Sequence, residues 1–211
     1  MDSGVQGGSE MKKTWVGVAV LWVCLGVAFA CGGASGTTEE SDVRVAGQAA
    51  NPVADQSLRD ASLEGQIDLM VAAVGDGAQI DAQDVDGRTA LMYAAFNGHT
   101  DCVRWLLERG AAVGTCENLG RTALMFASTG PFPETVELLL EFASNPHDAD
   151  EYEGWTPLMF AAGEGQIEVV RVLLENGANP FATDKDGDVA ADHAAKTHHP
   201  EVEALLRDAM Q

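Results

Sequence analysis

Histidines are the residues of this chain that most readily suggest chemistry, because three of them lie close together near the C-terminus. They are His193, His198 and His199, and Asp192 stands next to the first. Imidazole and carboxylate groups are common zinc ligands. However, His198 and His199 precede Pro200, a pattern typical of a turn between two helices where histidines are exposed. We therefore predict no metal site and no cofactor, and metal handling remains an alternative.

Carboxylates are numerous but match no catalytic pattern. Residues 184–188 read Asp-Lys-Asp-Gly-Asp and resemble the start of a calcium loop, but Val189 stands where that loop requires glycine and Ala195 where it requires glutamate. The densest acidic group is predicted to be a solvated loop and comprises Asp148, Asp150, Glu151 and Glu153. The sequence also contains no Gly-x-Ser-x-Gly elbow, phosphate loop or dinucleotide fingerprint. No enzymatic activity is predicted.

Cysteines offer a second kind of chemistry, and two of them fall in the C-terminal part of the chain. Cys102 stands at an apolar position of a predicted helix, so we expect a small buried hydrophobic side chain. Cys116 falls in a loop further along. A disulfide requires two Cα atoms within about 7 Å, which the start of a helix and a distant loop do not provide. No bond between these two cysteines is predicted.

The first residues resemble an export signal. Lys12 and Lys13 precede an apolar stretch, residues 14–30, that ends Ala-Phe-Ala. A positive start, a short apolar stretch and a small-x-small end are typical of such signals. The stretch is shorter than the roughly 20 residues that a membrane-spanning helix needs. We predict a signal peptide over residues 1–30, with Met11 as the true start.

Cys31 follows this signal directly and heads a stretch rich in Gly, Ser, Thr and acidic residues. Such a composition predicts a disordered tether, residues 31–55. A cysteine at this junction resembles a bacterial lipoprotein, which implies lipidation of Cys31 and a lipid-anchored protein of the periplasm or outer membrane. Two alternatives stay open: cleavage after Ala30 that releases a soluble periplasmic protein, and an uncleaved anchor.

The formal net charge of −21 limits the partners that the chain can bind. Nucleic-acid binding requires a basic surface, so it is excluded, and anionic lipid headgroups would repel the acidic part of the chain. A basic protein partner would be attracted by the field of such a surface. High solubility is the other interpretation of the same charge.

A period of 33 residues is the strongest feature of the chain. A glycine recurs with spacings of 33, 34 and 33 residues, at Gly87, Gly120, Gly154 and Gly187, and the first three of these glycines precede a tetrapeptide that runs from a threonine to a methionine. A Leu-rich segment follows each tetrapeptide. A fixed period of this length is typical of stacked repeats, in which one unit cannot bury its apolar face alone. The tetrapeptides are Thr89-Ala-Leu-Met92, Thr122-Ala-Leu-Met125 and Thr156-Pro-Leu-Met159.

This pattern resembles the ankyrin repeat, whose unit is a β-turn and two helices with a Thr-Pro-Leu-His-x-Ala core. The resemblance implies an all-α solenoid with short β-hairpin turns, over residues 56–211. Its parts are an N-terminal cap at 56–83, three full repeats at 84–116, 117–150 and 151–183, and a C-terminal cap at 184–211. We expect the threonines to cap helices, the glycines to adopt positive φ and the methionines to pack in the core where the family has histidine. Tyr93, Phe126 and Phe160 share one helix position and are also predicted to be core residues.

The resemblance also implies a function, because ankyrin domains bind protein partners through their hairpin tips and first helices, which form a concave surface. Large apolar and arginine side chains at those places are informative, since Trp, Tyr and Arg dominate interface hot spots. We predict a contact strip of Arg88, Phe96, Leu119, Arg121, Tyr152 and Trp155. The alternative for two of them is that Tyr152 and Trp155 pack on each other and on the adjacent turn.

The predicted protein is thus a monomeric, non-catalytic binding module of the bacterial envelope. Two alternatives differ in the partner: a toxin-neutralising protein whose acidic surface blocks a basic toxin, and a periplasmic stress or metal-handling protein.

Overall fold

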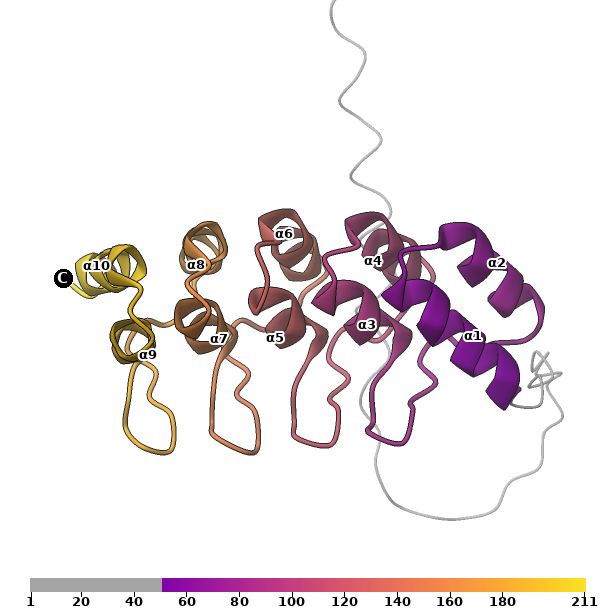
Figure 1. Ribbon diagram of the computed structural model, residues 1–211, viewed down its shortest axis with the longest axis horizontal. Helices are drawn as coiled ribbons and strands as arrows, with labels where there is room; N and C mark the ends of the chain where they lie inside the picture. The colour runs from indigo at the N-terminus through magenta and orange to yellow at the C-terminus, as the bar shows by residue number, and fades with distance from the viewer. Residues whose placement is uncertain (1–50) are drawn as a thin grey trace, which may run out of the picture. The chain divides into compact units, whose positions relative to one another are not determined.

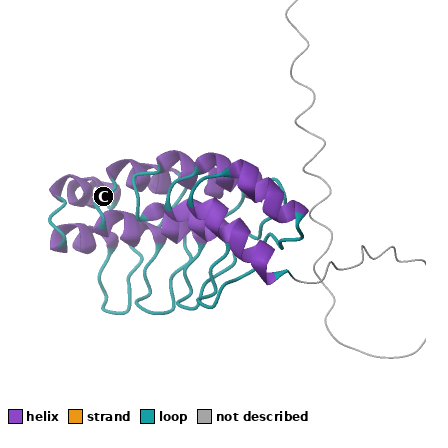
Figure 2. Cartoon of the chain, turned by 45° about the vertical axis from the view of Figure 1, so that its right-hand side comes forward, coloured by secondary structure: helices purple, strands orange, loops and turns teal. Residues whose placement is uncertain are grey.

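The computed structural model describes residues 51–211, so the predicted signal, Cys31 and most of the predicted tether lie outside the described residues. The described part folds into ten helices and no regular strand. Figures 1 and 2 show two parallel rows of helices, with loops projecting from one row. The helices are α1 (Pro52–Leu63), α2 (Ile67–Gly75), α3 (Ala90–Phe96), α4 (Thr100–Leu107), α5 (Ala123–Ser128), α6 (Pro133–Glu141), α7 (Pro157–Gly163), α8 (Ile167–Glu175), α9 (Ala190–Lys196) and α10 (Pro200–Ala209). The predicted all-α solenoid is confirmed.

The first helix of each full repeat begins where its threonine was expected to cap it. The side-chain oxygens of Thr89, Thr122 and Thr156 each accept a hydrogen bond from the backbone N–H of the following methionine, at 3.4 Å. Such a bond satisfies one of the backbone donors that a helix start leaves free. Pro157 occupies the first position of α7, where a missing N–H has no cost.

The core lies between the rows and runs from one repeat to the next. The methionine column is fully enclosed at Met92, Met125 and Met159, as predicted. Two of these sulfurs also accept a long contact from the backbone N–H of their own capping threonine, 3.5 Å at Met92 and 3.4 Å at Met159. The methionines therefore support the helix starts as well as filling the core. Leu106, Leu139 and Leu173 are equally enclosed in the second helices.

The hairpins that precede α3, α5, α7 and α9 are tight loops, and the described residues contain one isolated bridge, between Thr183 and Val189. In three of them the first residue donates its N–H to the carbonyl four residues on, as Asp84 does to Arg88 at 3.0 Å. In the third hairpin Asp150 donates to Trp155, five residues on, at 3.0 Å. The extra residue of the 34-residue spacing therefore lies inside this hairpin, which opens at Asp150 and not at Glu151 as predicted.

The two caps differ in construction. The N-terminal cap is the helix pair α1 and α2, and α1 begins at Pro52, four residues before the predicted boundary at 56. Asn51 caps α1 through its side chain, which accepts from Ala54 N at 3.3 Å. The C-terminal cap is the pair α9 and α10, with its own hairpin in front. No helix within residues 51–211 is both long and apolar enough to cross a membrane.

Candidate functional site

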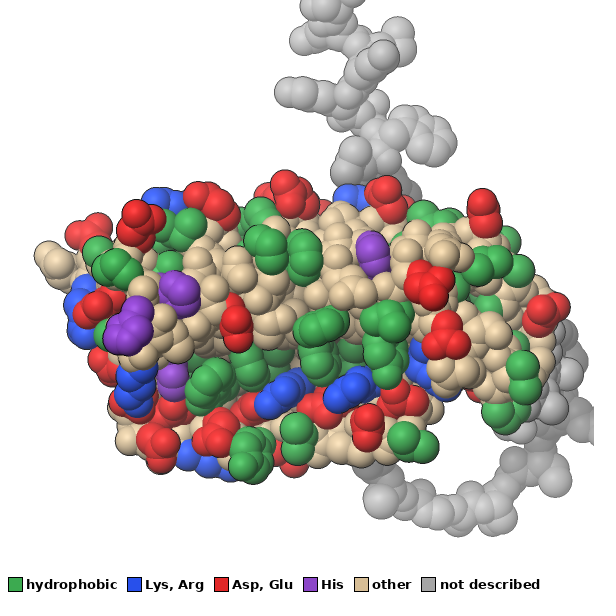
Figure 3. Space-filling view, in the orientation of Figure 1, with side chains coloured by type: hydrophobic (Ala, Val, Ile, Leu, Met, Phe, Trp, Pro, Cys, Tyr) green, Lys and Arg blue, Asp and Glu red, His purple; other side chains and the backbone are tan. Residues whose placement is uncertain are grey.

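A mixed apolar and basic surface lies between the hairpins and the first helices. Figure 3 shows a band of hydrophobic side chains there, with basic side chains lying along it and acidic side chains on the hairpins beneath. We call this surface the hairpin–helix face, and we define it by seven residues. They are Arg88, Phe96, Leu119, Arg121, Phe126, Tyr152 and Trp155.

Three apolar side chains of this face are exposed to solvent. Phe96 is 50% exposed at the end of α3, and Leu119 and Tyr152 are 41% and 62% exposed in their hairpins. The ring of Phe96 stands edge-on to that of Phe126, with centroids 6.2 Å apart. Such edge-to-face pairs fix ring positions. Phe96 and Phe126 therefore form an ordered aromatic surface that continues over two repeats.

The two arginines of the face are both held by carboxylates. Arg88 lies 3.7 Å from Asp86 on its own hairpin. Arg121 lies 3.4 Å from Asp150, which belongs to the next hairpin, and its guanidinium stands 5.3 Å from the ring centre of Phe160. Because Asp150 is only 4% exposed, Arg121 is anchored at a fixed place on the face. The prediction that Asp150 belongs to a solvated loop is wrong.

Asp150 is buried because it organises its hairpin. Its Oδ1 accepts hydrogen bonds from the backbone N–H groups of Glu153 at 2.9 Å, Gly154 at 2.8 Å and Trp155 at 3.1 Å. These N–H groups replace the water molecules that the carboxylate loses when it is buried. Gly154 within this turn has a φ of 80°, in the left-handed region that favours glycine, as predicted.

Trp155 packs on its neighbours and is half-buried. Its ring centre lies 5.3 Å from that of Phe160 in its own repeat and 4.4 Å from that of His193 in the C-terminal cap. Tyr152, in contrast, extends into solvent. The alternative that these two aromatic residues pack on each other finds no support among these contacts. Trp155 therefore has a packing role, as the alternative prediction allowed, but its ring partners are Phe160 and His193 and not Tyr152.

The column of Tyr93, Phe126 and Phe160 is less buried than predicted. Only Phe160 belongs to the core, whereas Tyr93 and Phe126 are partly exposed on the side of the hairpins. Phe160 is covered by Trp155 and Arg121, both large side chains that follow a hairpin glycine. Tyr93 instead donates its hydroxyl to Asp84 Oδ2 at 2.6 Å, and the fourth member of the column, His193, contacts Asp184 Oδ2 at 2.8 Å.

Asp84 and Asp184 each contact both their own hairpin, through backbone N–H groups, and a side chain of the helix that follows it. Burial alone would raise the pKa of Asp84, but the hydrogen bonds from Tyr93 and from the backbone of Arg88 and Asp86 outweigh it and lower the pKa. At Asp184 burial also acts to raise the pKa, and backbone hydrogen bonds together with His193 lower it. Both carboxylates are therefore fixed as anions that tie each hairpin to the helix after it.

Comparison with known families agrees with this geometry. A family model described as ankyrin repeats, in three copies, matches residues 58–150 and again residues 127–210. The chain belongs to the ankyrin-repeat family. No curated protein matches the chain. The family typically works without catalysis and binds proteins, so the ankyrin domain described above indicates a protein-interaction module.

The histidine cluster expected as an alternative metal site is not assembled in the ankyrin domain. His193 is buried and committed to Asp184, while His198 is exposed in the turn between α9 and α10 with a φ of 65°. Within residues 51–211, no three His, Cys, Asp or Glu side chains lie close enough together to hold a metal ion. The acidic motif at 184–188 serves as a repeat hairpin, in which Asp184 Oδ1 accepts from the N–H groups of Asp186 and Asp188, both at 2.9 Å.

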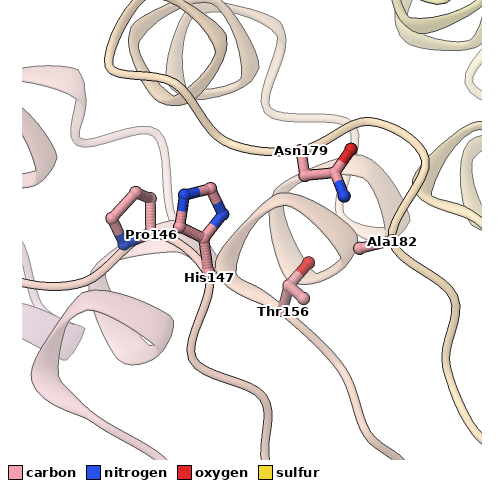
Figure 4. A pocket seen from close by; sticks show the side chains of 5 residues that line it. All are labelled: Pro146, His147, Thr156, Asn179 and Ala182. Atoms are coloured by element: carbon pink, nitrogen blue, oxygen red, sulfur yellow. The ribbon is translucent and has the colours of Figure 1, made fainter.

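The other chemistry-bearing side chains of the ankyrin domain are separate from the hairpin–helix face. Cys102 is buried and Cys116 is exposed, both as free thiols. Burial raises the pKa of Cys102, and partial desolvation of its sulfur together with nearby carboxylates raises the pKa of Cys116. A cavity of about 470 Å³ lies between the loops that follow α6 and α8, lined by Pro146, His147, Thr156, Asn179 and Ala182 (Figure 4). The hydroxyl of Thr156 is engaged in capping α7, and the Oδ1 of Asn179 accepts a hydrogen bond from the backbone N–H of Phe181 at 3.0 Å.

Proposed function

We propose that this ankyrin domain binds a protein partner through the hairpin–helix face. The observation that carries the proposal is the exposure of Phe96 at the end of a first helix and of Leu119 and Tyr152 in two hairpins, together with the edge-on contact of Phe96 with Phe126. Hairpin tips and the exposed ends of first helices accept polar residues without loss of stability, so apolar side chains there have no structural need. Exposed apolar groups that lie together, with polar residues around them, mark interaction sites.

The partner that fits this face best is a basic protein with apolar side chains. The chain has a net charge of −21, and the two arginines of the face are already paired with Asp86 and Asp150. Unpaired carboxylates on the hairpins would therefore meet basic residues of the partner, while the aromatic surface takes up its apolar side chains. Charge of this kind accelerates association and supports specificity more than affinity. A toxin-neutralising protein would be one member of this class.

The test is capture from an envelope extract with the full chain and a Phe96→Ala/Leu119→Ala double variant. Both side chains are exposed, so thermal stability should change little, whereas retention of the partner should fall at least tenfold. Phe181→Ala is the matched control, because Phe181 is 56% exposed but lies in the loop after α8, outside the hairpin–helix face. Equal retention by all three proteins would exclude the face as the binding site.

A partner of basic character predicts a further result in the same experiment. Capture should weaken as salt is raised from about 50 to 500 mM, because exposed charges are screened within a few ångströms at the higher concentration. If the retained protein is acidic, or if retention does not depend on salt, the partner is not recognised by its basic charge. The proposal that the hairpin–helix face is the binding site would still stand.

We further propose that the protein is exported and tethered through a lipidated Cys31. The basic residues before an apolar stretch, the small residues before Cys31 and the Gly/Ser-rich sequence after it support this proposal. Labelled palmitate fed to expressing cells should be incorporated into the wild-type protein and not into Cys31→Ser. Export without label would favour the soluble periplasmic alternative, and label retained by Cys31→Ser would contradict the proposed attachment site.

A further inference from the structure

The helix pairs at the two ends of the stack differ in how their surfaces are finished (Figure 1). At the C-terminal end Arg207 bridges Glu203 at 2.8 Å and Asp192 at 3.4 Å, so charged side chains link α9 to α10. At the N-terminal end a groove of about 330 Å³ lies between α1 and α2. Leu69, which lines this groove, is 53% exposed. The N-terminal pair therefore presents apolar surface where the C-terminal pair presents an ion-pair network.

The 33-residue register shows that the groove is a surface on which helices stack. Ser57 and Leu69 line the groove and are exposed. The residues 33 positions later, Ala90 and Cys102, are only 1% and 2% exposed, in the helices α3 and α4 that stack on α1 and α2. Within residues 51–211 no helix precedes α1 to cover the groove in the same way. Its shape is therefore suited to a helix.

The size of the groove limits how a helix can occupy it. A helix with its side chains is about 10–12 Å across, so a helix as long as the 12-residue α1 is too large to fit inside. It would lie over the opening and insert apolar side chains. Exposed apolar groups that lie together mark interaction sites, and four of the ten exposed large hydrophobic side chains of the ankyrin domain belong to α1 and α2. They are Val53, Leu63, Leu69 and Val71.

The groove also carries negative charge that no basic side chain balances. Asp60, Glu64 and Asp76 line it, together with no basic residue. Within the described part of the chain none of these three forms an ion pair. Arg59, the only basic residue of α1 and α2, is buried and donates to the carbonyl oxygen of Ala82 at 3.2 Å. Basic side chains on an occupant would therefore complement the groove.

We propose that the groove between α1 and α2 binds an amphipathic helix of a partner protein, with basic side chains against the three carboxylates and apolar side chains against Leu69. Helices that bind in grooves place their apolar residues at positions i, i+3, i+4 and i+7. The groove shares no residue with the hairpin–helix face, so this site does not depend on the function proposed for that face. A second copy of the chain is a poorer occupant, because two such grooves would bring their carboxylates together.

A synthetic peptide is the probe for this site. It is a fluorescent amphipathic helix of about 18 residues, about 27 Å long, built from Leu, Ala and Lys with the leucines on one face. Its binding to the full chain is measured by fluorescence anisotropy at about 150 mM salt, where charges more than about 8 Å apart are largely screened.

Glu64→Lys/Asp76→Lys is the test variant. Both residues cap the C-terminal end of a helix, where a lysine interacts favourably with the helix dipole, so the fold should be retained. We expect this variant to bind the peptide about tenfold more weakly than the wild-type chain. Leu69→Ser should also weaken binding, because it removes the apolar side chain of the groove.

Glu141→Lys/Glu175→Lys is the matched control, because it changes the net charge by the same amount at the last residues of α6 and α8, outside the groove. It should bind the peptide as the wild-type chain does. The proposal is overturned if the control loses binding equally, if a peptide of scrambled order binds equally well, or if the wild-type chain does not bind. It is also overturned if Phe96→Ala/Leu119→Ala abolishes binding, which would place the peptide on the hairpin–helix face. A wild-type dimer that Leu69→Ser dissociates would assign the groove to a second copy and overturn it as well.

Discussion

Replacing Asp150 with alanine is expected to lower the free energy of unfolding by about 3 kcal/mol, the lower end of the range found when one partner of a buried ion pair is removed, because Asp150 is buried while the Arg121 side chain is 31% exposed. The variant would leave the backbone N–H groups of Glu153, Gly154 and Trp155 without their acceptor and Arg121 without its carboxylate. Each buried donor that loses its partner costs about 1–3 kcal/mol. In a domain of this size the loss corresponds to roughly 6–12 °C in melting temperature, which thermal unfolding followed by circular dichroism would measure.

Two further variants separate this explanation from a general effect of charge. Glu151→Ala removes a neighbouring carboxylate that is exposed, and its free energy of unfolding should stay within about 0.5 kcal/mol of wild type. Asp150→Asn keeps one oxygen that can accept the three N–H groups and should lose less stability than Asp150→Ala. If Glu151→Ala is as damaging as Asp150→Ala, the third hairpin opens at Glu151 and the assigned register is wrong.

The parts of the fold that could be predicted from the sequence are those fixed by local chemistry repeated in register. A threonine before an apolar tetrapeptide caps a helix through its own side chain, and the structure confirms this at Thr89, Thr122 and Thr156. A glycine with positive φ is needed wherever the hairpin turns, and Gly87, Gly120, Gly154 and Gly187 all have it. Neither feature depends on a distant contact, so one repeat is enough to recognise it.

The position of the extra residue in the third hairpin could not be predicted in this way. The spacing of 34 residues showed that one residue is inserted, but Asp150 and Glu151 are both acidic and adjacent. Only the acceptance of three backbone N–H groups and the contact with Arg121 of the preceding hairpin distinguish them. Asp150 is distinguished as the acceptor by its contact with Arg121 in the preceding hairpin. A contact between repeats cannot be inferred from the sequence of one hairpin.

For the candidate binding face, the sequence predicts which side chains point outward but not how deeply each ring is buried. Phe96, Leu119 and Tyr152 lie where the repeat pattern placed them, exposed on hairpin tips and a first helix, because the pattern fixes which positions point outward. How far a given ring is buried depends on the side chain that follows the glycine of the hairpin in its own repeat. Phe160 is covered by Trp155, while Phe126 is not covered to the same degree. Burial therefore varies along one column although its residue types are similar.

The packing of Trp155 on Phe160 and His193 is expected to contribute to the stability of the domain. Trp155→Ala is expected to lower the free energy of unfolding by about 2 kcal/mol, below the 3–5 kcal/mol of a fully buried aromatic residue because the ring is half-exposed. The lost contacts join the third repeat to the C-terminal cap through His193, 4.4 Å away. Since repeat proteins are stabilised mainly by neighbouring units, amide hydrogen exchange should increase most in α9 and α10.

Tyr152→Ala is the control that tells stability from binding at this site. Tyr152 is 62% exposed on the same hairpin, so its removal should leave the melting temperature near wild type and reduce only partner capture. For Trp155→Ala, capture must be measured well below the melting temperature of the variant, where the cap is still folded. A wild-type melting temperature combined with lost capture would show that the indole contacts the partner directly, and that its packing on Phe160 and His193 contributes little. A lowered melting temperature with capture retained would instead restrict the binding face to its other members, Phe96, Leu119, Phe126, Tyr152 and the two arginines.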